Sequence, residues 1–180
     1  LIPAFGINGQ IVASAETTGP TKNKILAKFS DNSKEVYRVY IIMTGAETLL
    51  LMLGGLPIYD ALIHTFGTVG TGGLSIYNAS IGHYNNVYVE IVVAVFMFLA
   101  AINFNLFYMV KKRGVLQIFK DEETKFYTTV TISAGLLIAV YNFISDSFSQ
   151  FGEKLLNSFF QVISILTTTG YATDDYDVWP

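Results

Sequence analysis

Residues 68–75 of the sequence read TVGTGGLS, and residues 167–172 read TTTGYA. Neither tract is built from residues that form a stable helix, because glycine loses too much backbone freedom and threonine is stiff at its β-carbon. Each tract follows a short apolar segment, at 57–67 and at 153–166, that is compatible with a helix but too short to cross a bilayer. We interpret these segments as re-entrant or interfacial helices that lead into extended tracts.

Three longer apolar runs surround these elements. They cover residues 36–53, 87–110 and 126–144, and the second has Glu90 as its only charge. As a helix, the run at 87–110 would extend about 36 Å, which is enough to cross a hydrocarbon core of about 30 Å. We therefore expect three membrane-spanning helices in an all-α protein.

The layout of long helix, short helix and tract occurs twice. Superposing Gly73 on Gly170 gives a period of 97 residues (170 − 73). Identity between the two copies is low, so it is the layout that repeats. The predicted divisions are a loop and surface helix at 1–35, a complete unit at 36–110, a linker at 111–125 and an incomplete unit at 126–180.

The composition favours an integral membrane protein. Charged residues make up only 14% of the 180 residues, against about 25% in soluble domains, and apolar residues reach 52%. A net charge of −3 argues against a nucleic-acid partner, and the absence of cysteine excludes a disulfide scaffold, a cysteine zinc site and a thiol nucleophile. Because the chain starts at Leu1 and runs on to Trp179-Pro180, we expect a fragment of something longer.

The placement of charge predicts the topology. Ten of the eleven Lys and Arg residues lie before the first run, at its start (Arg38), or between the second and third runs. The positive-inside rule then makes the N-terminal region and residues 111–125 cytoplasmic, and both tracts open outward in the same orientation. The outer regions carry Asp60, Asp146, Glu153, Asp174, Asp175 and Asp177, an acidic set that would concentrate cations there.

The tracts have the composition of an ion path. Non-helical backbone is tolerated at membrane depth where it is buried in protein or lines a watery path, and its carbonyl oxygens can then replace the water shell of a cation. Neither tract contains an acid, which favours a monovalent cation. The candidate filter residues are Gly70, Thr71, Gly72, Gly73, Thr167, Thr168, Thr169 and Gly170.

An ordered set of short motifs accompanies the tracts. It consists of ETTGP at 16–20, TGGLS at 71–75, NASIG at 78–82, AINF at 101–104, DEETKFY at 121–127, SILTTTGYA at 164–172 and WP at 179–180. Together the motifs resemble the second pore unit and most of the third of the Trk-type potassium uptake proteins (the TrkH/KtrB superfamily). The linker motif favours the TrkH branch.

The resemblance implies tandem M1–P–M2 pore units, in which a re-entrant pore helix (P) lies between two membrane helices, with four non-identical units in one polypeptide. It implies potassium uptake across the cell inner membrane by symport. It also implies one filter glycine per unit, at Gly73 and Gly170, and potassium ligands from Thr71, Gly72, Thr168 and Thr169. The implied partners are the remaining pore units, a second copy in a homodimer, a cytosolic nucleotide-binding regulatory subunit of the TrkA/KtrA type and the lipid bilayer. No organic cofactor is expected.

Other functions remain alternatives at this stage. A secondary transporter could bind a cation or small solute at broken helices, but it would need inverted units. A phosphate loop is disfavoured because no lysine follows the glycines of 68–75. An intramembrane enzyme is disfavoured because the chain has two distant histidines and no paired acids within a span.

An acid, a histidine and a basic run outside the tracts also have expected roles. Glu47, in the middle of the first run, is expected to be a structural acid hydrogen-bonded to a threonine or to backbone in a neighbouring unit. His64 is expected to pack behind the filter rather than to relay protons. The basic run at 111–113 is expected to anchor the topology.

Overall fold

The computed structural model describes residues 29–104, 106, 107, 110, 114, 118, 120–145 and 151–174. All regular structure in this part of the chain is helical, which confirms the expected helical class. The helices are α2 (Phe29–Leu53), α3 (Ile58–Val69), the short 3-10 helix η2 (Ser80–Tyr84), α4 (Val87–Ala100), α6 (Glu122–Ser145) and α7 (Phe151–Leu166).

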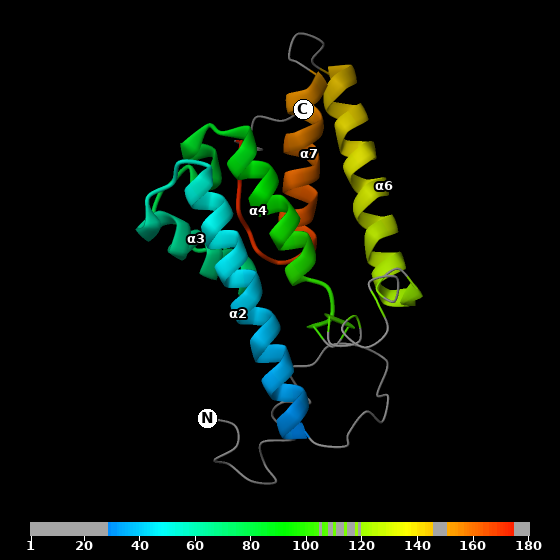
Figure 1. Ribbon diagram of the computed structural model, residues 1–180. Coiled ribbons are helices and arrows are strands. Elements are labelled where there is room, and N and C mark those ends of the chain that lie inside the picture. Colours follow the sequence, from blue (N-terminus) through cyan, green and yellow to red (C-terminus); the bar gives the residue numbers. More distant parts are fainter. Residues whose placement is uncertain are drawn as a thin grey trace.

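The helices pack as two pairs joined by α4. Helix α2 packs against α3, α6 packs against α7, and α4 contacts α2, α3 and α7. Helices α2 and α6 run in the same direction, and α4 and α7 run in the opposite one (Figure 1). Each pair therefore consists of a long helix followed by a shorter helix that returns alongside it.

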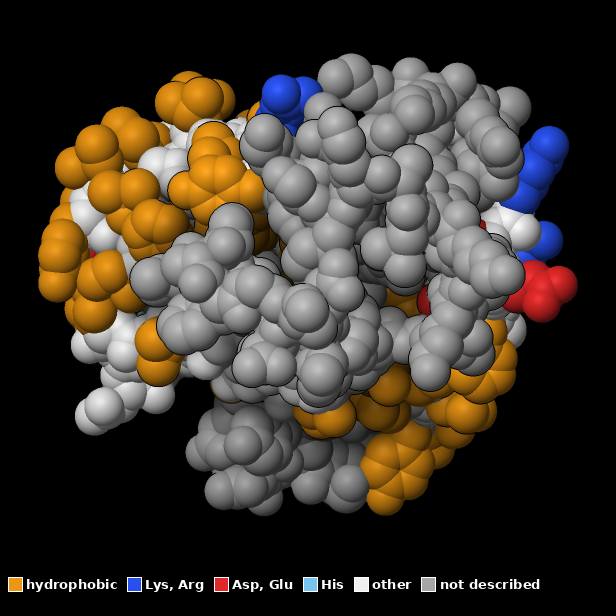
Figure 2. All heavy atoms as spheres, turned by 90° about the horizontal axis from the view of Figure 1, so that it is seen from below, with side chains coloured by type: hydrophobic (Ala, Val, Ile, Leu, Met, Phe, Trp, Pro, Cys, Tyr) orange, Lys and Arg blue, Asp and Glu red, His pale blue; other side chains and the backbone are white. Residues whose placement is uncertain are grey.

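Within the described residues, two helices have the length and composition needed to cross a membrane. They are the stretches Val36–Leu53 of α2 and Glu122–Ile144 of α6, of which only 22% and 17% is buried inside the chain. Large apolar side chains such as Leu49 and Leu137 are exposed on them. Seen from the end at which α6 begins, hydrophobic side chains cover much of the described surface and charged ones gather at its edge (Figure 2).

The second expected span is not one continuous helix. Helix α4 ends at Ala100, and the N–H of Ile102 turns back to Leu99 O at 3.2 Å. A new turn opens where Leu106 N–H donates to Asn103 O at 2.9 Å. The predicted helix over 87–110 is therefore wrong, and asparagine, which favours helix starts over helix interiors, lies at the break.

Local chemistry explains the other helix boundaries. Gly55, with φ at 93°, and Pro57, directly before α3, separate α2 from α3. The Asn86 side chain caps α4 by accepting from Tyr88 N–H at 3.0 Å, and its Nδ2 donates to Gly54 O at 3.1 Å. This second bond ties the start of α4 to the end of α2.

Helix α6 begins inside the region predicted to be a linker. Asp121 Oδ2 accepts from the N–H of Thr124 at 3.0 Å and from its hydroxyl at 3.1 Å. This is an N-cap, and Glu122 and Glu123 in the first turn add negative charge where the helix dipole favours it. The apolar run at 126–144 is therefore the interior of a longer helix.

The main buried cluster lies between α2, α3 and α4. It includes Leu51, Ala61, Val93 and Met97, and the second half of the chain adds Phe160, Ile163 and Tyr171. Gly135 of α6 lies against the ring of Phe159 on α7, where a β-carbon would come within 2.7 Å of Cε1. Close packing of this kind fixes the two shorter helices, and with them the starts of both tracts.

Candidate ion filter

Both tracts leave their helices through the same backbone turn. Four hydrogen bonds of the first tract recur 97 residues later, which confirms the predicted register. The pairs are Gly70 N to Phe66 O (3.0 Å) and Thr167 N to Ile163 O (2.9 Å); Thr71 N to Thr68 O (3.0 Å) and Thr168 N to Ile165 O (3.0 Å); Gly72 N to Gly67 O (2.7 Å) and Thr169 N to Ser164 O (3.0 Å); Gly73 N to Gly67 O (3.1 Å) and Gly170 N to Ser164 O (3.3 Å).

The left-handed residues of the two turns also match. Thr71 has φ at 49° and its counterpart Thr168 has φ at 58°, while Gly73 and Gly170 have φ at 57° and 84°. A left-handed conformation costs a non-glycine residue about 1–2 kcal/mol, so it persists only where the surrounding structure enforces it. The same unusual conformation at two equivalent threonines shows that the turns are one motif used twice.

The two tracts lie against each other. A β-carbon at Gly73 would collide with the carbonyl oxygen of Thr169, so only glycine fits this approach. Further along, Gly82 N–H donates to Ala172 O at 3.1 Å, and Ala172 N–H donates to Ser80 Oγ at 3.2 Å. After α7 the chain turns and runs back beside that helix, toward the first half of the chain (Figure 1).

Two of the three threonine hydroxyls of the second tract are engaged within it. Thr167 Oγ1 and Thr169 Oγ1 lie 2.7 Å apart, and both side chains are buried. Thr168 and Gly170 are exposed, as are Gly70 and Gly72 in the first tract. The Thr167 and Thr169 hydroxyls are thus committed to each other, and the main-chain oxygens and the Thr168 hydroxyl are the candidate ion ligands in this tract.

A hydrogen-bonded network lies behind the first tract. Asp60 Oδ2 accepts from the hydroxyls of Tyr84 at 2.9 Å and Tyr77 at 3.1 Å. Since Tyr84 gives its proton to the carboxylate, its oxygen is the acceptor for His64 Nε2 at 3.0 Å, which leaves Nδ1 unprotonated. His64 Nδ1 has no hydrogen-bond partner among the described residues.

His64 and its neighbours behave as buried neutral groups. His64 is completely buried and packs edge-on against Tyr84 and Tyr171, as expected of a packing residue. Burial lowers the pKa of His64, and Asp60 offsets part of that effect. The pKa of Tyr84 is raised by burial and by its bond to the Asp60 carboxylate. The ring of His64 is therefore held in its uncharged form.

Sequence reasoning missed the part played by Tyr171. The side chain is fully buried, and its hydroxyl lies 3.0 Å from His64 O and 3.1 Å from Leu74 O. Its own carbonyl accepts from Ser164 Oγ at 2.6 Å. The second tract thus supports the first, and the one available signal was an aromatic residue directly after the tract glycine.

The carboxyl group of Glu47 is buried without a hydrogen-bond partner among the described residues. The side chain is fully buried and Thr68 is within reach, yet neither carboxyl oxygen accepts a hydrogen bond from a described residue. The expected hydrogen bond to a threonine or backbone group of a neighbouring unit is not made among the described residues, and it stays a prediction. The donor protons nearby are directed elsewhere, as the Thr68 hydroxyl donates to His64 O at 2.8 Å.

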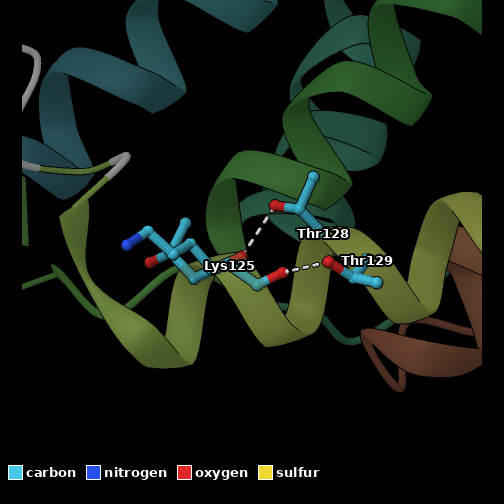
Figure 3. Close-up of a pocket in the computed structure, with 4 residues that line it drawn as sticks. Lys125, Thr128 and Thr129 are labelled. Atoms are coloured by element: carbon cyan, nitrogen blue, oxygen red, sulfur yellow. Dashed lines mark hydrogen bonds between the residues drawn. The ribbon is translucent and has the colours of Figure 1, made fainter.

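A shallow surface pocket on α6 lies outside this site. It is lined by Thr124, Lys125, Thr128 and Thr129 (Figure 3). The hydroxyls of Thr128 and Thr129 donate to carbonyls of their own helix, at 2.7 and 2.8 Å. The hydroxyls of its three threonines are already paired, and none of its lining residues belongs to either tract. The basic run at 111–113 and Asp175 and Asp177 lie outside the described residues.

The described part of the chain is helical, includes two helices long and apolar enough to cross a membrane, and brings two Gly/Thr tracts into contact. The chain belongs to the TrkH family of cation transport proteins, which it matches over residues 1–180. This membership confirms the expectation of a transport protein rather than an enzyme.

Individual relatives bear out this assignment. The chain is 28% identical over 182 residues to the Trk system potassium uptake protein TrkH of Salmonella typhimurium, covering 100% of this chain and 38% of that protein. It is 32% identical to TrkG of Escherichia coli K12, covering 37% of that protein. It superposes on the crystal structure of the potassium transporter TrkH from Vibrio parahaemolyticus with a TM-score of 0.82 at 24% identity, over 94% of this chain and 36% of that one. The chain therefore spans well under half the length of these relatives.

Proposed function

We propose that this chain supplies two quarters of a potassium-selective filter in a membrane uptake protein. The observation that carries the proposal is the twice-used turn, which brings two glycine-bearing tracts into contact at Gly73 and Thr169. The relatives named as potassium uptake proteins support potassium as the transported ion. In this proposal potassium is cargo, and it is bound only in transit.

The ligands are main-chain oxygens of Thr71, Gly72, Thr168 and Thr169. Such oxygens stand in for the water shell of the ion, and the lack of acids in both tracts suits a monovalent cation. Gly70, Gly73, Thr167 and Gly170 shape the turns that present these oxygens. The C-terminal ends of α3 and α7 lead into the tracts, so the helix dipoles add negative potential there.

The units are tandem rather than inverted. The parallel course of α2 and α6 supports this reading, because inverted repeats would make these helices antiparallel (Figure 1). Helices α3 and α7 are then re-entrant pore helices of the second and third units of four. The alternative, a secondary transporter with broken-helix sites in inverted units, lacks this support.

The remaining proposals concern the setting of the protein. We infer a multi-pass protein of the cell inner membrane, with the N-terminal region and residues 111–125 cytoplasmic, following the distribution of Lys and Arg. Its partners are the other two pore units, a second copy and a cytosolic nucleotide-binding subunit. Coupling of potassium entry to another ion, as a symport, belongs to the same proposal.

Replacing the filter glycines tests the proposed function. Full-length protein carrying Gly73→Ser or Gly170→Ser is expressed in cells that lack potassium uptake, and potassium and sodium fluxes are measured. We expect potassium-over-sodium discrimination to fall for both variants, while Gly152→Ser, at an exposed helical position with open space around it, leaves it unchanged. Unchanged discrimination in both tract variants, with the proteins present in the membrane, would refute the proposal.

A further inference from the structure

The carboxyl group of Glu47 is buried at the junction of three chain segments. It belongs to α2, Thr68 of α3 is within its reach, and Tyr171 of the second tract lies within electrostatic range. All three side chains have no or almost no exposure. Neither oxygen of Glu47 accepts a hydrogen bond from a described residue, so this part of the chain does not supply the donors that an ionised carboxylate requires.

The neighbouring hydroxyls present acceptor atoms toward this junction. Each hydroxyl has one proton and two lone pairs. Thr68 directs its proton to His64 O at 2.8 Å, and Tyr171 directs its proton to the carbonyls of His64 and Leu74. With their protons committed to main-chain carbonyls, both oxygens have only lone pairs left to offer.

An ionised carboxylate does not suit such surroundings. It can only accept, and without donors its burial is strongly unfavourable. A protonated carboxyl group has one O–H to donate and matches a lone pair on a neighbour. A dehydrated alkali ion would need a full shell of oxygens, whereas a proton needs a single acceptor.

We propose that Glu47 is a proton-binding site, a neutral carboxylic acid that donates a hydrogen bond to Thr68 Oγ1 behind the first tract. Thr68 lies in the last turn of α3, so this bond ties α2 to the helix end that leads into the tract. The link to ion selection rests on the proposed function, whereas the protonation state of Glu47 does not.

The other titratable groups around the junction do not take this role. On α3, the Asp60 carboxylate is occupied by Tyr77 and Tyr84, and His64 donates to Tyr84. On α4, Glu90 is acidic and cannot neutralise a second acid. On α2 itself, Arg38 lies nine positions before Glu47, more than two helical turns away.

Infrared difference spectroscopy of the full-length protein in lipid tests the proposal directly. The spectrum of Glu47→Gln is subtracted from that of the wild type near neutral pH. We expect a protonated-carboxyl C=O band in the difference, shifted by exchange into D₂O. Glu122→Gln, at an exposed position in the first turn of α6, gives no such band. Carboxylate bands in place of the protonated band would overturn the proposal.

A second variant tests whether Thr68 is the acceptor. It leaves Glu47 in place, so the proposal can still be tested if Glu47→Gln fails to fold. Thr68→Val keeps the shape of the side chain but removes the acceptor, so the C=O band of Glu47 is expected to move to higher frequency. An unmoved band would overturn the assignment of Thr68. Glu47→Gln itself keeps a donor and similar volume, so potassium uptake is expected to stay within about threefold of the wild type. If the protonated-carboxyl band of Glu47 is present but Gly73→Ser and Gly170→Ser leave potassium-over-sodium discrimination unchanged, the filter proposal is refuted. The proton site at Glu47 is then still supported.

Discussion

The hydroxyl of Tyr171 lies 3.1 Å from the carbonyl oxygen of Leu74, and these two residues occupy equivalent places in the two tracts, 97 positions apart. Leu74 itself is exposed and has no hydroxyl, so the support runs in one direction only. The relationship makes the conformation of the first tract dependent on the second. It is also a difference between the two copies of the motif, whose backbone turns are otherwise the same.

Removing the Tyr171 hydroxyl should disturb the first tract. In Tyr171→Phe, Leu74 O loses its donor, while His64 O keeps the Thr68 hydroxyl. We expect a loss of about 1–2 kcal/mol in stability and a larger change in potassium-over-sodium discrimination than in total uptake. Thermal unfolding and ion fluxes of the full-length protein measure the two effects.

The matched control for this prediction is Tyr141→Phe, because Tyr141 is exposed on α6. It should change neither unfolding nor discrimination. If Tyr171→Phe behaved like this control, the hydroxyl would have no role in positioning the tract.

The two tract glycines should respond differently to alanine. A β-carbon at Gly73 meets the carbonyl of Thr169, whereas one at Gly170 finds open space within this chain. Gly170→Ala should cost about 1–2 kcal/mol for the left-handed backbone alone. Gly73→Ala should add about 1–3 kcal/mol for overpacking. Unfolding midpoints of the two variants give the comparison, and equal losses would show that the tracts are not in contact.

The contact between η2 and the second tract should contribute measurably to stability. Ser80 Oγ accepts from Ala172 N–H, and Ser80→Ala removes that acceptor while keeping the β-carbon at a residue with φ of 53°. We expect a loss of about 1 kcal/mol, because a partly buried N–H is left without its partner. Ser133→Ala, on an exposed face of α6, serves as the control and should be neutral within about 0.5 kcal/mol.

Acidification should weaken the region around His64. Burial lowers the pKa of His64 below its ordinary value of 6.5, so the unfolded chain binds this proton more readily than the folded one. The stability that His64 contributes is therefore present above pH 6.5 and is lost as the pH falls below that value. In His64→Gln, whose amide can still donate to Tyr84, the unfolding temperature should depend less steeply on pH in this range. A dependence as steep as that of the wild type would contradict the assignment.

Much of the fold could be predicted because its signals are local. Apolar residues alone predict the long helices, at 36–53 and 126–144. The glycines alone predict that the two tracts are not helical. The register of Gly73 on Gly170 needed only the layout of the sequence. The left-handed Thr71 and Thr168 could not be predicted in this way, because local preference disfavours that conformation for a β-branched residue.

The features that escaped prediction depend on contacts between distant residues. No glycine or proline marks the end of α4, so the break near Asn103 is invisible to a hydropathy argument. The bonds of Tyr171 reach residues 97 and 107 positions away. The missing donors around Glu47 could be recognised only once the protons of Thr68 and Tyr171 had been assigned to other oxygens.

The central claim is that main-chain oxygens of both tracts bind one passing ion, and heavy-cation crystallography tests it most directly. Crystals of the full-length protein grown with rubidium or thallium would be examined for anomalous scattering. The account predicts a peak within coordination distance of the carbonyl oxygens of Thr71, Gly72, Thr168 and Thr169. A cation bound elsewhere, with no density between the two tracts in a protein that still transports potassium, would contradict it.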